Sequence, residues 1–142
     1  MKRIIIILIT TISYFATASP QKESNVINLN KADFLTKVFN YEKNTTWKYE
    51  GDKPCIIDFY ANWCRPCKEV APIVEEIAKA YKDKIIVYKI DTDKESELFR
   101  ALSLGRSIPT FLFIPVQGKP MVVRGAMPKE QFDIYINQLF NF

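Results

Sequence analysis

The sequence of 142 residues contains no histidine and only three cysteines. Without histidine there can be no Ser-His or Cys-His nucleophilic pair, no histidine-ligated zinc or copper and no imidazole acid–base catalysis. Any catalysis must therefore use cysteine, carboxylate, lysine or tyrosine side chains.

Long apolar runs are also missing, apart from one short stretch at Ile4–Phe15. It follows the basic Lys2 and Arg3 and precedes the small residues Ala16–Ala18, which is the pattern of a secretory signal peptide. A membrane-spanning helix needs ~20 apolar residues, so cleavage is favoured over an uncleaved anchor. No cysteine follows the run that would carry a lipid. We therefore predict a signal peptide at 1–18, and export to the periplasm or the cell exterior.

The charge of the chain is nearly balanced. Removal of residues 1–18 would leave 18 basic and 16 acidic residues, a net charge of +2. This surplus is small and evenly spread, so it indicates neither a nucleic acid nor an anionic membrane surface as partner. The remaining length suits one domain, predicted at 26–142 after a flexible tail at 19–25. We expect this domain to be a monomer.

Hydrophobic periodicity predicts an α/β domain with a mixed sheet and helices on both faces. Parallel crossover connections come first and a hairpin turning at Gly118 comes last. The polar connection at 42–54 is expected to lie on the surface. The predicted elements are strands at 26–30, 55–61, 84–91, 109–115 and 121–125, with helices after Asn30, after Cys67, at 94–105 and at 128–140.

The motif Cys64-Arg65-Pro66-Cys67 stands where the strand at 55–61 gives way to a helix. Residues i and i+3 lie on one helical face, close enough for two sulfurs to bond. Cys64 would lie at the helix N-terminus, where unpaired N–H groups and the helix dipole favour a thiolate. Cys67 lies one turn further and lacks those donors. We therefore expect Cys64 to attack a disulfide and Cys67 to resolve the mixed disulfide.

The segment from Ile56 to Ala78, IIDFYANWCRPCKEVAPIVEEIA, resembles the active-site segment of the thioredoxin family. Its parts are a strand, the motif Trp-Cys-x-Pro-Cys-Lys and a helix containing a proline. Ser107–Thr110, SIPT, resembles the family's cis-proline loop. The resemblance extends from Val26 to the C-terminus. It implies a thioredoxin fold and a thiol–disulfide oxidoreductase whose redox centre is a Cys64–Cys67 disulfide, with no cofactor and no metal.

The resemblance also implies roles for two charged residues. Asp58 matches the family's buried carboxylate, whose pKa burial should raise and which would accept a proton from Cys67. Lys89 falls where the family often has a lysine paired with that carboxylate. The alternatives are a structural, hydrogen-bonded carboxylate at Asp58 and a solvent-exposed lysine at Lys89.

The substrate is expected to bind around Cys64. Pro109 matches the cis-proline that faces the disulfide, and Ile108 would offer backbone groups to an extended peptide. Side chains near Cys64 would add an apolar rim. The predicted substrate-binding residues are Trp63, Arg65, Pro66, Ile108, Pro109, Gly125 and Ala126.

Two features depart from the family pattern. Arg65 replaces the usual glycine, and its charge is expected to stabilise the thiolate and make the disulfide more oxidising, unless solvent screens it. Selection of acidic partners is the alternative role for Arg65. The connection at 42–54 is longer than usual. Its extra length would form either a surface for a partner or a plain extension. Separately, Cys55 is expected to be a buried, inert thiol rather than part of a regulatory or intermolecular disulfide.

Two other functions remain open from the sequence. The cysteine pair could bind Cu(I), although no histidine or second cysteine pair completes a site. The domain could also be a non-catalytic binding scaffold with a structural disulfide. For an oxidoreductase, the expected partners are proteins with disulfides or dithiols. A membrane protein that delivers or accepts electrons is expected as well, because an oxidising compartment supplies no reductant.

Overall fold

The computed structural model describes residues 24–142. The predicted signal peptide at 1–18 lies outside the described residues, as does most of the predicted tail at 19–25. Ser24 and Asn25 belong to that tail, yet the Ser24 hydroxyl and the Asn25 N–H both donate hydrogen bonds to the Glu75 carboxylate. These two residues are therefore part of the folded domain.

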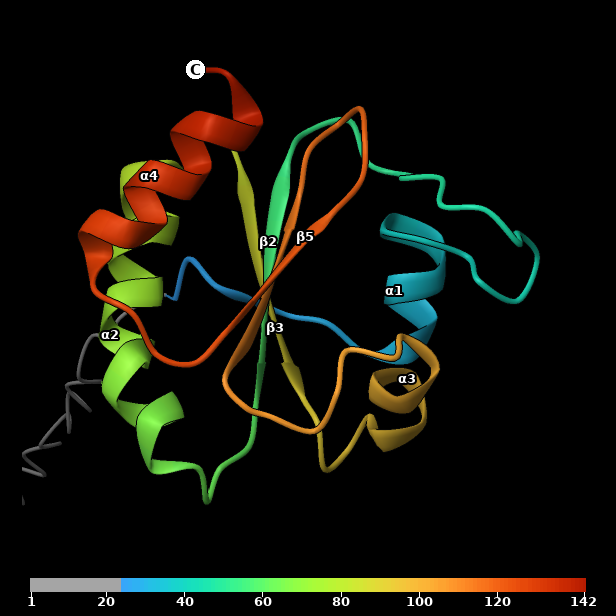
Figure 1. Cartoon of the computed structure of the whole chain (residues 1–142), viewed down its shortest axis with the longest axis horizontal. Helices are drawn as coiled ribbons and strands as arrows, with labels where there is room; N and C mark the ends of the chain where they lie inside the picture. Colours follow the sequence, from blue (N-terminus) through green and yellow to red (C-terminus); the bar gives the residue numbers. More distant parts are fainter. Residues whose placement is uncertain (1–23) are drawn as a thin grey trace, which may run out of the picture.

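A five-stranded mixed sheet forms the centre of the domain, with strand order β1-β3-β2-β4-β5 (Figure 1). β3 pairs in parallel with both β1 and β2, whereas β4 pairs antiparallel with β2 and with β5. The predicted sequence of parallel crossovers followed by a hairpin is confirmed. The strands are β1 (Ile27–Asn28), β2 (Cys55–Tyr60), β3 (Ile86–Asp91), β4 (Thr110–Ile114) and β5 (Met121–Arg124).

Four helices cover the two faces of the sheet. α2 (Arg65–Ala80) and α4 (Lys129–Phe140) lie on one face, and α1 (Lys31–Lys37) and α3 (Ser96–Ala101) lie on the other (Figure 1). α1 begins after Asn30, as predicted, and Asn30 caps it, because its side chain accepts a hydrogen bond from the N–H of Asp33. Within residues 24–142, no helix has the length and apolar character required to cross a bilayer.

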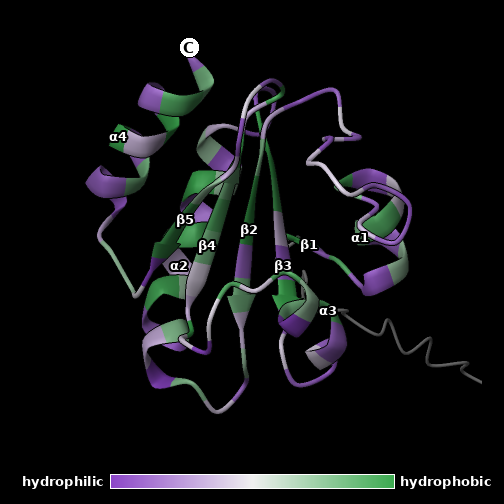
Figure 2. Ribbon diagram, turned by 45° about the vertical axis from the view of Figure 1, so that its right-hand side comes forward, coloured by the Kyte–Doolittle hydropathy of each residue, from purple (hydrophilic) through white to green (hydrophobic). Residues whose placement is uncertain are grey.

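Successive strand residues face opposite sides of the sheet and so build two cores. Ile56 packs in the core beneath α2 and α4, whereas Ile57 and Phe59 pack in the core beneath α1 and α3. Figure 2 shows the central strands as largely hydrophobic ribbons, interrupted by hydrophilic segments in β2 and β3. By the same alternation, Asp58 points toward the face that α2 covers. The fold thus places a carboxylate under the helix that carries the cysteine motif.

The third helix is shorter than the predicted 94–105 segment. α3 ends at Ala101, Ser103 adopts a φ of 52° and Gly105 a φ of 92°. Leu98 and Leu104 are both buried in the same core. Residues six apart in an α-helix lie on different faces, so the chain must leave the helix to bury both. An irregular loop therefore runs from Leu102 to Pro109.

The connection at 42–54 is held to the domain by aromatic packing. The ring of Trp47 lies 4.8 Å from that of Phe39, and both Trp47 and Tyr49 pack against the α1–α3 core. The N–H of Glu50 donates to the carbonyl of Val38. The connection lies on the surface, as expected, but its Trp47 and Tyr49 side chains face inward and are partly buried.

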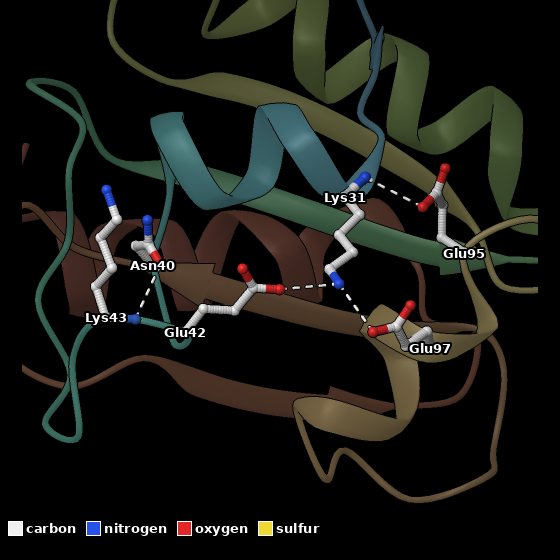
Figure 3. A network of polar contacts seen from close by, with 6 residues as sticks. All are labelled: Lys31, Asn40, Glu42, Lys43, Glu95 and Glu97. Carbon is white, nitrogen blue, oxygen red and sulfur yellow. Dashed lines mark hydrogen bonds and ion pairs between the residues drawn. The ribbon is translucent and has the colours of Figure 1, made fainter.

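A polar network joins this connection to α1 and α3 (Figure 3). The Lys31 ammonium lies 2.9 Å from a Glu42 carboxylate oxygen and 2.8 Å from one of Glu97. The backbone N–H of Lys31 donates to Glu95. Because these groups are largely exposed, the network contributes more to orientation than to stability.

Candidate active site

The cysteine motif lies at the N-terminus of α2, as predicted. β2 ends at Tyr60, and Cys64 is the N-cap residue of the helix that begins at Arg65. The Cys64 Sγ accepts a hydrogen bond from the N–H of Cys67, at 3.2 Å. Pro66 has no N–H, so its position adds no unpaired donor to the first turn. This helix start directs an N–H donor and the positive end of the helix dipole at Cys64 Sγ.

The structure shows the oxidised form of the pair, because Cys64 and Cys67 are joined by a disulfide. Each cysteine is only 3% exposed, and Ala61 and Ile108 pack beside them. The two sulfurs therefore do not differ in exposure. They differ in their surroundings: Cys64 Sγ accepts the Cys67 N–H at the helix start, whereas Cys67 lines a pocket on the other side.

That pocket brings Asp58 and Cys67 together. It has a volume of about 210 Å³, and both residues line it. Asp58 is buried, and its Oδ1 has no hydrogen-bond partner among residues 24–142. Burial raises the pKa of Asp58 from 3.8 to about 7, while the charge of Lys89 acts in the opposite direction. Asp58 can thus take up and release a proton near neutral pH.

Two lysines accompany Asp58. Lys89 is directly opposite Asp58 in the β2–β3 register, and it is half-buried. Lys89 and Lys68 both line the pocket that contains Cys67 and a neighbouring pocket of about 360 Å³. No ion pair within 4.0 Å joins either lysine to Asp58. Lys89 therefore acts on Asp58 through its charge rather than through a direct contact.

The loop before β4 faces the disulfide. The peptide bond between Ile108 and Pro109 is cis, as predicted, and Ile108 packs against the cysteines. The Gly125 N–H donates to the Pro109 carbonyl at 2.8 Å. Ile108, Pro109 and Gly125 are thereby brought together beside Cys64, where an extended substrate would bind.

Trp63 projects from the surface next to Cys64. It is 70% exposed, and its indole Nε1 donates to Asp93 Oδ2 at 2.9 Å. The turn between β3 and α3 positions Asp93, because the Asp91 carboxylate accepts a hydrogen bond from the Asp93 N–H. An exposed indole held by a hydrogen bond presents a large apolar face at little entropic cost.

Arg65 points into solvent. Its side chain is 89% exposed, and its Nε donates to Glu69 Oε1 at 3.0 Å, one turn along α2. Solvent and this carboxylate both screen the guanidinium, so the predicted stabilisation of the Cys64 thiolate by Arg65 is small.

The other predicted rim residues are also exposed at this end of the domain. Pro66 lies on the surface of the first turn of α2. Ala126 is exposed and lines a shallow groove of about 230 Å³ with Glu69 and Val70 of α2. The structure thus places Ala126 along the flank of α2.

Cys55 is a free, fully buried thiol at the start of β2. Burial raises the pKa of this thiol to about 12. Its surroundings agree with the expectation of inert packing, because a neutral, inaccessible thiol neither attacks nor exchanges.

Three residues at this end of the domain were missed from the sequence: Lys68, Asp93 and Arg124. Asp93 follows the end of β3, and the carboxyl ends of parallel strands meet at one edge of a sheet. Its place in the sequence could therefore have predicted that it lies near the cysteine motif. Arg124 donates two hydrogen bonds to the Leu104 carbonyl. No sequence pattern pointed to that contact. Across residues 24–142, no three His, Cys, Asp or Glu side chains gather as a metal-binding group.

A disulfide at a helix start, a buried carboxylate beneath it and a cis-proline loop facing it define a thiol–disulfide oxidoreductase. The thioredoxin family model matches residues 25–138. A thioredoxin from Borreliella burgdorferi is 47% identical over 116 residues, which cover 82% of this chain and 98% of that protein. The chloroplastic M-type thioredoxin of Spinacia oleracea is 35% identical over 82% of this chain and 66% of its own length.

A solved structure supports the fold independently. The crystal structure of chloroplastic thioredoxin z superimposes with a TM-score of 0.67 over 80% of this chain and 93% of that chain, at 24% identity. The chain belongs to the thioredoxin family. It is a protein-disulfide oxidoreductase of the thioredoxin type, with the Cys64–Cys67 disulfide as its redox centre.

Proposed function

We propose that this protein is an exported thioredoxin that exchanges disulfides with protein substrates through a mixed disulfide on Cys64. Three features support export. Residues 1–18 carry the composition of a signal peptide, and the family match begins only at residue 25. The relative from Borreliella burgdorferi aligns over nearly its whole length with only 82% of this chain.

The proposed reaction begins with the reduced protein. The Cys64 thiolate attacks one sulfur of a substrate disulfide, and the other substrate sulfur leaves as a thiolate. Cys67 then loses its proton to Asp58 and attacks Cys64 Sγ, which releases the second substrate thiolate. The protein is oxidised by two electrons and the substrate is reduced by two. Run in reverse, the same steps oxidise a substrate dithiol.

One observation carries this division of roles. Cys64 Sγ lies at the helix N-cap and accepts the Cys67 N–H, whereas Cys67 faces the pocket that contains Asp58. The attacking sulfur is stabilised as an anion by the helix start, and the resolving sulfur has a proton acceptor nearby.

The substrate is proposed to bind as an extended peptide across Ile108, with Trp63 and Gly125 on either side. Ile108 packs against the disulfide, and its loop leads into β4. Backbone hydrogen bonds would fix the peptide and the indole of Trp63 would cover its apolar part. We propose that the domain does this as a monomer. A membrane protein would supply or remove its electrons, because an oxidising compartment holds no reductant.

A trapping experiment tests the reaction. In Cys67→Ser the resolving step is blocked, so incubation of the reduced variant with a disulfide-bonded protein should accumulate a covalent complex through Cys64. Cys64→Ser is the matched control and should give no complex. Equal trapping by both variants, or by neither, would contradict the assigned roles.

Export is tested separately. The mass and N-terminal sequence of the protein isolated from its native host should correspond to a chain that begins at Ser19. A full-length chain in the cytosolic fraction would disprove export without affecting the chemistry.

A further inference from the structure

The loop from Leu102 to Pro109 carries Ile108 to the disulfide but has no regular secondary structure of its own. A backbone that is not held by a helix or a sheet needs other partners for its polar groups. One end of this loop is secured by β4, where the Thr110 hydroxyl donates to the Ser107 carbonyl at 2.6 Å. The other end is held by the last turn of α3, where the N–H groups of Leu102 and Ser103 donate to backbone carbonyls of that helix. The Leu104 carbonyl, beyond this turn, needs another partner.

Arg124, the last residue of β5, provides that contact. Its Nε and Nη2 donate to the Leu104 carbonyl at 3.1 Å and 2.9 Å. In the described part of the chain, no backbone N–H donates to this carbonyl. The Arg124 fork therefore satisfies it alone.

The local backbone is shaped to admit the guanidinium. Gly105 follows Leu104 with a φ of 92°, and a Cβ built on it would lie 3.5 Å from Arg124 Nε. Glycine adopts this conformation without strain, which turns the Leu104 carbonyl toward β5. The residue after Arg124 is Gly125, whose N–H holds the Pro109 carbonyl. Arg124, at the end of β5, and Gly125, which follows it, thus hold the Leu104 and Pro109 carbonyls of the substrate-facing loop.

We propose that Arg124 is a positioning residue, which fixes the loop from Leu102 to Pro109 in the conformation that receives a protein substrate. This inference rests on the proposed function and assigns to it a residue that does not contact the sulfurs. Arg124 binds the loop, the loop presents Ile108, and Ile108 forms the surface beside Cys64. A small disulfide that reaches Cys64 without using that surface should not depend on Arg124.

Arg124→Leu tests the inference, since it removes both donors and keeps an apolar stem. With insulin as the protein disulfide and dithiothreitol as the reductant, KM should rise about tenfold with little change in kcat, a loss of about 1.4 kcal/mol. The rate with 5,5′-dithiobis(2-nitrobenzoate) and the reduction potential should stay unchanged. Arg124→Lys keeps one donor nitrogen, so its KM should lie between that of the wild type and that of Arg124→Leu.

Arg106→Leu is the matched control. Arg106 lies in the same loop, is exposed, and makes no side-chain hydrogen bond or ion pair within residues 24–142. Its removal takes the same charge from the same surface and should leave KM unchanged. An equal rise in KM for both variants would overturn the inference, because surface charge would then be the cause. An unchanged KM in Arg124→Leu, or a parallel loss with the small disulfide, would overturn it as well.

Hydrogen exchange provides a readout that does not require activity. In Arg124→Leu the hydrogen-bonded amides at the two sides of the loop, those of Ser103 and Gly125, should exchange about tenfold faster, while those of α4 keep their protection. Unchanged exchange in the loop would show that other contacts hold it. If the wild-type protein failed to reduce insulin, the proposed function would fail, and this exchange measurement would still decide whether Arg124 holds the loop.

Discussion

Asp58 and Lys89 occupy paired positions on β2 and β3, yet burial outweighs the attraction between their charges. The pKa of Asp58 is raised to about 7 although the positive charge of Lys89 lowers it. Because the buried carboxyl is poorly solvated, its ionisation lowers the stability of the folded protein. The same property makes it a proton acceptor for Cys67.

Asp58→Asn should stabilise the protein at pH 8. Below pH 3.8 the carboxyl is protonated in both states; between pH 3.8 and 7 only the unfolded state loses its proton, so wild-type stability falls as pH rises. The shift of about three pH units corresponds to up to about 4 kcal/mol. Urea unfolding measures the free energy of unfolding of both proteins. The difference between Asp58→Asn and the wild type should increase by up to that amount from pH 4 to pH 8.

Asp83→Asn is the control for this comparison, because Asp83 is exposed between α2 and β3. It should behave like the wild type at both pH values. An advantage of Asp58→Asn that is equal at pH 4 and pH 8 would show that ionisation of Asp58 is not the cause.

Lys89→Met should raise the pKa of Asp58 further above 7. The charge of Lys89 favours the ionised carboxyl, so its removal leaves the effect of burial unopposed. The titration midpoint of Asp58, followed by carbon NMR of its carboxyl group, should move to higher pH. Lys82→Met, at an exposed position, should leave it in place. A midpoint that does not move in Lys89→Met would identify Lys89 as a solvent-exposed lysine without influence on the site.

Arg65→Gly should shift the reduction potential by less than about 30 mV, the equivalent of about 1.4 kcal/mol. The guanidinium is 89% exposed and paired with Glu69, so solvent screens its effect on Cys64. Equilibration with glutathione buffers measures the potential. Glu69→Gln, which leaves Arg65 unpaired, is the companion variant. A large move toward a more reducing potential in Arg65→Gly would restore the original expectation for this residue.

Cys55→Ala should cost about 1–2 kcal/mol of stability and leave disulfide exchange unchanged. The thiol is fully buried in the α1–α3 core, where its loss leaves a small cavity. Cys55→Val fills more of that space and should cost less. Chemical denaturation and the insulin assay measure the two effects. A slower exchange reaction in a stably folded Cys55→Ala protein would show that this thiol takes part in the chemistry.

The elements around the active site could be predicted because their signals are local. β2 is apolar except for Asp58, α2 repeats its apolar residues at helical spacing, and Cys64 and Cys67 mark the junction. The cis bond at Pro109 and the burial of Asp58 followed from the resemblance to the thioredoxin family. Both are present in the structure.

What could not be predicted depends on contacts between distant segments. The length of α3 is set by the need to bury Leu104 together with Leu98, which helical periodicity alone does not reveal. Trp47 packs on Phe39, so a side chain from the polar connection at 42–54 covers the edge of the α1–α3 core. Likewise, the partners of Trp63 and Arg65 are Asp93 and Glu69, and only the fold decides whether their charges reach the sulfur.

The hydrogen bonds from Ser24 and Asn25 to Glu75 determine where the upstream chain joins the domain. Glu75 lies eleven positions after Cys64 along α2, roughly 16 Å along its axis. Whatever precedes Ser24 must therefore enter the folded domain at the side of α2 rather than beside Cys64.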